Sequence, residues 1–215
     1  MKAELHSHTV YSRKCGNIKP RDLIKYAKLK GLDEVVITDH DTIKGYLAVR
    51  KLRPDVKVVC GEEITTKDGE LLGLFLTEEV KSGMSAEETI DEIHKQGGLA
   101  IAPHPFDIRN GLRSKITRLK LDGIEVFNSR TLWRKADTLA RIHALQLGLT
   151  GTAGSDAHFP SELGTSYVEY EDDLYKAIKR NKLILHARYT PIPVHLSYAL
   201  LNKFRKALQL RRQED

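Results

Sequence analysis

The stretch Val35-Val36-Ile37-Thr38-Asp39-His40 decides the fold, because a short apolar run typical of a buried strand leads directly into side chains that can bind a metal ion. The same arrangement recurs where residues 3–5 precede His6 and His8, residues 58–61 precede Glu62 and Glu63, residues 99–103 precede His104, and residues 150–155 precede Asp156 and His158. In a βα repeat the carboxyl ends of the strands meet on one face, where active sites of that architecture lie. The sequence therefore predicts one centre that holds more than one metal ion.

Short β-branched runs alternate with longer helical patterns along the chain. We expect strands near residues 2–6, 34–38, 56–64, 70–76, 99–102, 122–127, 150–154, 165–169 and 183–187, and helices near residues 20–31, 43–53, 85–97, 132–148 and 172–181. Ser85 followed by Glu88 predicts a capped helix start, and Gly97 predicts its end. This alternation predicts an α/β fold with a parallel sheet or a βα barrel. We expect a single domain over residues 1–215, with a closing amphipathic helix at about 195–212.

The composition is that of an ordinary globular domain, with 40% hydrophobic and 30% charged residues. No run reaches the roughly 20 apolar residues of a membrane span, the first residues do not form a signal peptide, and Cys15 and Cys60 do not form a disulfide framework. We therefore expect a cytoplasmic protein with no membrane partner. The net charge of +6 reflects basic residues near 109–120 and 203–212. They could attract phosphates or nucleic acid, but a solvated helix face is the preferred interpretation of the C-terminal cluster, and we expect no stable nucleic-acid complex.

The spacing of the candidate ligands suits a metal centre. His6 and His8 are two residues apart, so on a strand both imidazoles point to the same side, and Asp156 and His158 repeat this spacing. Glu63 is the natural bridging candidate, because one carboxylate can span two ions about 3.5–4 Å apart. Burying so many histidines and acids without partners would be very costly. Bound metal ions are the simplest compensation.

The remaining histidines differ in their position relative to the predicted strands. His104 directly precedes Pro105, which favours an extended backbone at the end of its strand. Four histidines lack such a setting and are expected to be ordinary polar residues: His94, His143, His186 and His195.

The combined motifs resemble those of the PHP family (polymerase and histidinol phosphatase domain). They are His6-Ser7-His8-Thr9, Ile37-Thr38-Asp39-His40-Asp41-Thr42, Gly61-Glu62-Glu63, His104-Pro105-Phe106, Glu125-Val126-Phe127-Asn128 and Gly154-Ser155-Asp156-Ala157-His158, and they follow the family's order from about residue 2 to 190. The resemblance implies a distorted, TIM-like (β/α)7 barrel with two or three divalent ions in a cleft. Family members use zinc, manganese or iron and hydrolyse phosphoesters.

Carried over position by position, the resemblance implies three metal positions. The implied ligands are His6, His8, Glu63 and Asp156 for the first ion, Glu63 and His104 for the second, and His40 and His158 for the third. The second and third ions would each need one further ligand. Asp39 would be a carboxylate that orients a ligand histidine from behind.

Two positions depart from the family pattern. Residues 12–16 stand where many members have Ser-Asp-Gly, so the acid that would complete the third position is missing. That position is then empty, completed by water, or served by the thiolate of Cys15, which would suit zinc; alternatively Arg13 or Lys14 replaces a metal charge and binds phosphate. Glu70 aligns with a metal-binding histidine of many members, and its oxygen would favour manganese or iron over zinc.

The expected function is hydrolysis of a phosphoric ester by a metal-activated water. Dications would neutralise the phosphate, lower the pKa of the water and stabilise the attacking and leaving oxygens. Arg109 and Arg130 are further candidates for phosphate binding, with ordinary surface arginines as the alternative. The expected substrate is a small phosphate monoester or a short nucleotide. The alternatives are a nuclease or 3′ exonuclease of the PHP type acting on short oligonucleotides, and an inactive metal-binding module with a structural role.

Overall fold

The computed structural model describes residues 1–12, 15–197 and 200–201. Over these residues one sheet has the strand order β7-β6-β5-β4-β3-β2-β1-β8-β9. The strands are β1 (Lys2–Glu4), β2 (Glu34–Ile37), β3 (Lys57–Thr65), β4 (Glu70–Leu74), β5 (Leu99–Ala102), β6 (Gly123–Asn128), β7 (Thr150–Gly154), β8 (Tyr167–Glu169) and β9 (Ile184–His186). Each of these strands lies within or beside a run that the apolar pattern predicts.

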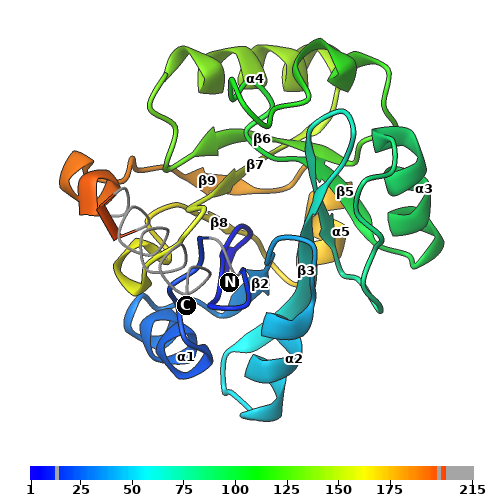
Figure 1. The fold of residues 1–215 in the computed structure, drawn as a ribbon. Helices are drawn as coiled ribbons and strands as arrows, with labels where there is room; N and C mark the ends of the chain where they lie inside the picture. Colours follow the sequence, from blue (N-terminus) through cyan, green and yellow to red (C-terminus); the bar gives the residue numbers. More distant parts are fainter. Residues whose placement is uncertain (13–14, 198–199, 202–215) are drawn as a thin grey trace, which may run out of the picture.

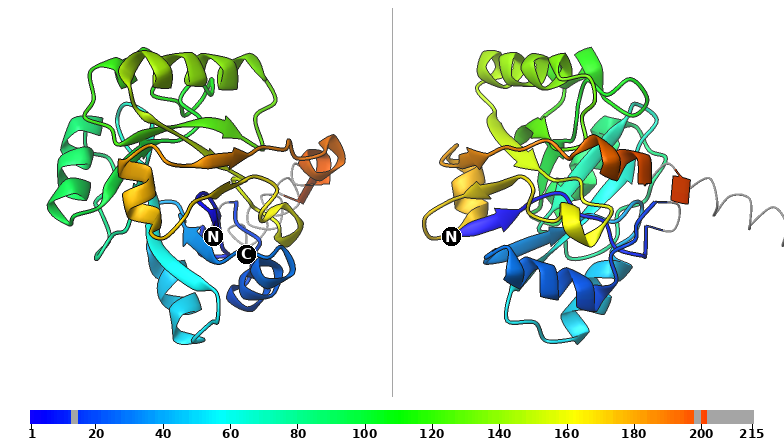
Figure 2. Two further views of the ribbon diagram at one scale, coloured as in Figure 1. Left: turned by 180° about the vertical axis from the view of Figure 1, so that it is seen from behind. Right: turned by 90° about the vertical axis from the view of Figure 1, so that its left-hand side faces the viewer.

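The sheet curves into a nearly closed barrel with helices on its outside (Figures 1 and 2). The helices are α1 (Pro20–Leu29), α2 (Lys44–Lys51), α3 (Ala86–Lys95), α4 (Lys135–Leu147) and α5 (Leu174–Lys179), with short 3-10 turns η1 (Arg113–Thr117) and η2 (Pro160–Glu162). Helix α3 begins as predicted: the Ser85 hydroxyl accepts from the backbone N–H of Glu88, and the Glu88 carboxylate accepts from the N–H of Ser85. The predicted α/β barrel class is confirmed.

Strand direction differs from that of a purely parallel sheet. β1, β2 and β3 are parallel, as are β5, β6 and β7, but β4 is antiparallel to both β3 and β5, and β8 is antiparallel to β1. Only residues 66–69 connect β3 to β4, whereas a parallel crossover requires a dozen or more residues. The first residue of β4 therefore lies at the edge where β3 ends, and Thr65 pairs with Glu70.

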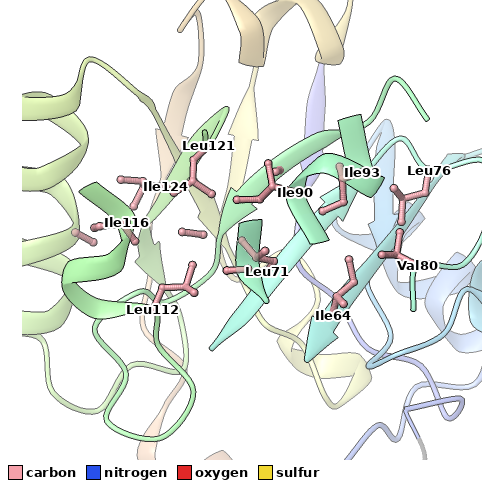
Figure 3. Packing of buried hydrophobic residues seen from close by; sticks show 14 of the residues in the cluster. Ile64, Leu71, Leu76, Val80, Ile90, Ile93, Leu112, Ile116, Leu121 and Ile124 are labelled. Carbon is pink, nitrogen blue, oxygen red and sulfur yellow. The ribbon is translucent and has the colours of Figure 1, made fainter. Parts of the chain in front are cut away.

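A hydrophobic core between the sheet and α3 holds the strands in place. Figure 3 shows Ile90 and Ile93 of α3 packed with Ile64 of β3 and Leu71 of β4. All four side chains are at most 1% exposed. Because each buried side chain of this size contributes about 1.5–3 kcal/mol, the core fixes the strand ends that carry the polar motifs.

The C-terminal segment is described only in part. Residues 192–197 and 200–201 are helical, whereas residues 198–199 and 202–215, and with them most of the predicted closing helix, lie outside the described residues. On the described part of the predicted apolar stripe, Leu196 is 60% exposed and Leu200 is 59% exposed. None of the helices in the described residues has the length and apolarity needed to cross a membrane.

Candidate metal centre

The predicted ligand side chains lie together at one edge of the sheet. They follow or end the strands as expected: His6 and His8 after β1, His40 after β2, Glu63 in β3, His104 after β5, and Asp156 and His158 after β7. Glu70 joins them because the antiparallel β4 begins at this edge. An open cleft of about 1490 Å³ lies over the edge, and the exposed sides of His40, Glu63, Glu70, His104, Asp156 and His158 line it. All eight candidates are therefore brought to one place.

Glu63 lies at the centre of this group. Its Oε2 atom lies 3.3 Å from His6 Nε2, 3.2 Å from His8 Nε2 and 3.3 Å from His40 Nδ1. Its Oε1 atom lies 3.0 Å from His104 Nε2. The two oxygens of one buried carboxylate thus face different imidazoles, which is the arrangement that a bridge between two ions requires.

Asp156 completes the group from the opposite side. Its Oδ1 atom lies 3.2 Å from His8 Nε2, 3.7 Å from His6 Nε2 and 3.3 Å from His158 Nδ1. The backbone of Asp156 has φ 50° and that of His104 has φ 26°, in the left-handed region that non-glycine residues rarely adopt. The extended backbone that Pro105 predicts for His104 is therefore wrong. Such a conformation costs about 1–3 kcal/mol and is found preferentially at functional sites. Both strained residues carry side chains of this centre.

Buried nitrogen atoms show that the side chains fit a cation. His6 Nε2 and His8 Nε2 are buried next to Glu63 and Asp156, yet neither has a hydrogen-bond partner of acceptable geometry among the described residues. Several sets of ligand atoms lie within 4.8 Å of one another: His6, His8 and Glu63; His6, His104 and Asp156; His40, Glu63 and Glu70; and His8, Cys15, His40 and His158. Imidazole nitrogens and carboxylate oxygens are the ligands of zinc, manganese and iron.

The close packing of opposite charges shifts several pKa values. Burial alone lowers the pKa of His8, but the carboxylates of Asp156 and Glu63 outweigh burial and raise it to about 9. His104 behaves alike: burial opposes the charge, and Glu63 raises the pKa to about 10. Burial, followed by repulsion from Glu63, raises the pKa of Glu70 to about 8. Protons thus balance the carboxylates in the metal-free protein, and a bound dication would take over that role.

Glu125, to which the strand-end motifs assign no role, contacts the candidate ligands from behind. It is buried in β6, where its Oε1 atom lies 3.1 Å from His6 Nδ1 and its Oε2 atom accepts hydrogen bonds from the backbone N–H of His104 and from Asn128. A carboxylate on the Nδ1 side of an imidazole leaves Nε2 free to bind metal. Gly154 of β7 makes room, since a Cβ there would lie 2.4 Å from Glu125 Oε1. A charged residue within the apolar β6 run is the sequence signal that could have revealed it.

Asp39 acts on the histidines through Ser12. Its Oδ1 atom accepts hydrogen bonds from the backbone N–H groups of Thr9 and Ser12 and from the Ser12 hydroxyl. Ser12 Oγ in turn lies 3.2 Å from His8 Nδ1 and accepts from the backbone N–H of His40. Asp39 therefore contacts His8 only through an intervening hydroxyl, and its orienting role stays a prediction.

The candidate phosphate-binding residues lie in different settings. Arg130 lines the cleft, and its guanidinium donates to Glu162, which also accepts backbone N–H groups of the loop after β7. Arg109 is exposed at the mouth of the cleft. Arg13 and Lys14 lie outside the described residues.

The histidines expected to be ordinary occupy mostly separate positions. His94 pairs with Asp122 and His186 with Glu169, both away from the cleft. His143 stacks on Phe106, with ring centroids 5.1 Å apart. His195 departs from the expectation, because it lines the cleft. Its neighbours in the sequence give no sign of this placement.

Apolar side chains surround the mouth of the cleft. Phe106, Ile108, Leu132 and Trp133 line it, and Ile108, Leu132 and Trp133 are 71%, 76% and 49% exposed. The described lining as a whole is rich in carboxylates and poor in cations. Its carboxylates are Asp41, Glu63, Glu70, Glu79, Asp107, Asp137 and Asp156, and its cations are Lys44, Arg109 and Arg130. The cleft thus combines an apolar rim with an acidic floor.

The chain is similar in sequence to proteins of one archaeon. It is 50% identical over 141 residues to Uncharacterized protein MJ1587 of Methanocaldococcus jannaschii, an alignment that covers 60% of this chain and 82% of that protein. It is 33% identical over 180 residues to Uncharacterized protein MJ0417 of the same organism, covering 80% of this chain and 71% of that protein. Residues 135–183 match the family model described as PHP-associated.

A solved structure shares the fold. A two-domain protein of Bacteroides vulgatus, described as containing a predicted PHP-like metal-dependent phosphoesterase, superposes with a TM-score of 0.73 at 21% identity. The alignment covers 87% of this chain but 65% of that protein, so the chain spans slightly less than two thirds of its length. This likeness concerns the barrel, and it agrees with the family model and with the motifs at the strand ends. Residues 135–183 thus match a PHP-associated family model, and the fold of the chain is similar to that of a protein containing a predicted PHP-like phosphoesterase.

Proposed function

We propose that the protein is a metal-dependent phosphoesterase, a hydrolase that cleaves a small phosphate monoester or a short nucleotide with a metal-activated water. The observation that carries this proposal is the position of Glu63, whose two oxygens face the nitrogens of His6, His8, His40 and His104. A single buried carboxylate whose two oxygens face different imidazoles could serve as a ligand to two dications. Bound there, such ions would neutralise the phosphate and lower the pKa of an attacking water.

The chain's own residues would hold and orient the reacting groups. His6, His8, Glu63 and Asp156 would bind one ion, with Glu125 fixing the proton of His6 on Nδ1. The other ion would be held by Glu63, His104 and Glu70. Glu70 Oε1 lies 3.8 Å from His40 Nδ1, and Glu70 Oε2 lies 3.8 Å from His104 Nε2. His40 and His158 would bind a third. Arg109 and Arg130, at the wall of the cleft, would contact the phosphate oxygens.

The charges of the cleft favour a small substrate. An acidic floor repels a phosphate unless dications are bound, so substrate binding would depend on the metal ions. A nucleic-acid strand requires a basic groove that follows its backbone, whereas the described lining has cations only at Lys44, Arg109 and Arg130. A monoester or a short nucleotide fits this distribution better than a polynucleotide.

The size and rim of the cleft point to a leaving group with an apolar part. The cleft volume of about 1490 Å³ exceeds that of typical ligand pockets, which measure about 300–1,000 Å³. Phe106 and Trp133 offer aromatic faces beside the acidic floor. An aromatic ester or a nucleotide base could stack there while the phosphate lies over the floor.

The proposal is tested by metal analysis combined with hydrolysis assays. Purified protein loaded with manganese, iron or zinc is expected to bind at least two equivalents and to hydrolyse p-nitrophenyl phosphate faster than its bis ester, with turnover lost after chelation. Asp156→Asn and His8→Ala should lose both metal and turnover, while Glu62→Gln, a buried acid that faces away from the centre, should keep both. Preference for the bis ester or oligonucleotides would favour a nuclease. Stoichiometric metal without turnover on any ester would favour a structural module, and less than one equivalent would refute the metal centre.

A further inference from the structure

The structure assigns a third metal ligand set that contains sulfur: we infer that the thiolate of Cys15, together with His40 and His158, binds a zinc ion beside the two ions of the proposed function. The inference rests on that proposed function. Its basis is the set of ligand atoms of His8, Cys15, His40 and His158, which all lie within 4.8 Å of one another. Cys15 also lines the cleft, so an ion held by this set would face the substrate.

The separation of these atoms matches the requirements of zinc. Tetrahedral coordination with zinc–sulfur and zinc–nitrogen bonds of about 2.0–2.3 Å places ligand atoms about 3.3–3.8 Å apart. The observed limit of 4.8 Å requires the side chains to move inward by about 1 Å, which rotation about their χ angles can supply. The imidazoles of His40 and His158 both contact the ring of His8. The ring centroid of His40 lies 4.7 Å from that of His8, and the ring centroid of His158 lies 4.5 Å from it.

The arrangement of His8 decides which residues serve the third ion. His8 is fully buried, its Nδ1 atom lies 3.2 Å from Ser12 Oγ, and its unpartnered Nε2 atom lies 3.2 Å from both Glu63 and Asp156. One nitrogen can bind one ion, so His8 Nε2 serves the ion between Glu63 and Asp156. Three protein ligands then remain for the third ion, with a fourth position open. This composition is that of a catalytic zinc site, whereas structural zinc sites have four protein ligands.

Sulfur gives the third position a different metal preference from the others. The two positions around Glu63 are rich in carboxylate oxygen, from Glu63, Glu70 and Asp156, and suit manganese or iron as well as zinc. A thiolate with two imidazoles is softer and selects zinc or cobalt over manganese. Binding at the third position displaces the thiol proton to solvent, and no change of oxidation state is involved. The protein is therefore expected to bind unlike ions side by side.

The test is cobalt(II) substitution, which reports a metal–sulfur bond directly. Metal-free protein titrated with cobalt(II) should develop a near-ultraviolet sulfur-to-cobalt charge-transfer band, whose final intensity corresponds to one of the bound cobalt equivalents. Cys15→Ser should abolish the band and remove one equivalent of bound zinc. Cys60→Ala removes the other cysteine, which is buried in β3, and should leave the band intact. Circular dichroism shows whether each variant is folded.

A second variant keeps the inference testable should the serine variant fail to fold. Cys15→Asp retains a ligand at the position but replaces sulfur with oxygen. It should restore the third equivalent with manganese, without the charge-transfer band. A band that persists in Cys15→Ser, or its absence from wild type at full cobalt occupancy, would overturn the inference. Two bound equivalents and normal ester hydrolysis without the band would overturn it while leaving the proposed function standing.

Discussion

Replacing Glu125 with glutamine should weaken metal binding by changing the proton position on a neighbouring histidine. Glu125 Oε1 faces His6 Nδ1, while Oε2 accepts from two donors, the backbone N–H of His104 and the side-chain amide of Asn128. A glutamine amide has one accepting oxygen and one donating nitrogen. If the oxygen keeps the two donors, the NH2 group meets His6 Nδ1. His6 must then carry its proton on Nε2, the atom that faces Glu63 and Asp156 and is proposed to bind metal.

The magnitude follows from the hydrogen bond that is lost. In the reversed orientation the glutamine NH2 group would face the backbone N–H of His104 and the amide of Asn128, which are also donors. The orientation that keeps the glutamine oxygen toward these two donors therefore costs less free energy. Binding metal in the variant requires His6 to return its proton to Nδ1, against the NH2 group and without the carboxylate. A hydrogen bond to a charged group contributes about 1.5–3 kcal/mol, and Glu125 is buried, so solvent does not screen it. Zinc affinity should therefore fall by about 10- to 150-fold. Mutation of such outer partners in metal sites generally costs about 10- to 100-fold.

Competition with a chromophoric chelator measures the zinc affinity, and nitrogen-15 NMR of the imidazoles reports the tautomer of His6. Glu62→Gln is the matched control, because Glu62 is a buried acid whose Oε2 accepts from the backbone N–H of Val80. Burial raises the pKa of Glu62 to about 8, so its carboxyl group is already neutral at pH 7 and an amide resembles it. A zinc affinity for Glu125→Gln equal to that of the control, or His6 still protonated on Nδ1, would refute the reasoning.

Three further perturbations test other parts of the structure. The pKa of Glu62 in the folded protein, about 8, lies above its ordinary 4.5, so the stability of wild type falls as pH rises through that range. Urea denaturation of the metal-free protein should show Glu62→Gln gaining about 4 kcal/mol on wild type between pH 5 and 9, and a pH-independent difference would contradict the burial. Gly45→Ala places a Cβ 1.8 Å from Asp39 Oδ2 and should lower the free energy of unfolding by about 1–3 kcal/mol. Gly151→Ala should cost less, because its Cβ meets a valine methyl at 3.1 Å. Equal losses in the two variants would show that α2 can move away from the carboxylate. Trp133→Ala should raise KM for p-nitrophenyl phosphate about 2- to 12-fold with little change in kcat, because the exposed indole would no longer stack on the aromatic ester. KM for an alkyl phosphate should stay unchanged. An equal rise in KM for both esters would exclude stacking.

The polar motifs at the strand ends could be located without coordinates. Apolar runs such as residues 35–38 and 99–102 are long enough to form buried strands and too short to form helices. The residues that follow them, among them His40 and His104, must then emerge at one edge. Every ligand candidate predicted in this way lies within the same cluster in the structure. This clustering could be anticipated because strand length and the position of a motif relative to the strand are local properties.

The network behind the imidazoles could not be obtained in the same way. Glu125 and His6 are separated by 119 residues, and their contact depends on the pairing of β6 with β7 and on the small Gly154 between them. Ser12 connects Asp39 to His8 only because the loop after β1 folds back over β2. A charge within the apolar β6 run marks Glu125 as unusual, but the residue types alone do not tell which side chains these residues contact.

The sequence by itself determined the class of fold and the kinds of donor atom at the strand ends, since both depend on short apolar runs and the residues that follow them. Tertiary structure alone decided which oxygen faces which nitrogen. The direction of β4 brings Glu70 to the cluster, and Cys15 lies close to His40 and His158 although 25 or more residues separate them along the chain. The physical reason is that a metal centre depends on distances of a few ångströms between residues far apart in the chain, and only the packing of the whole barrel sets them.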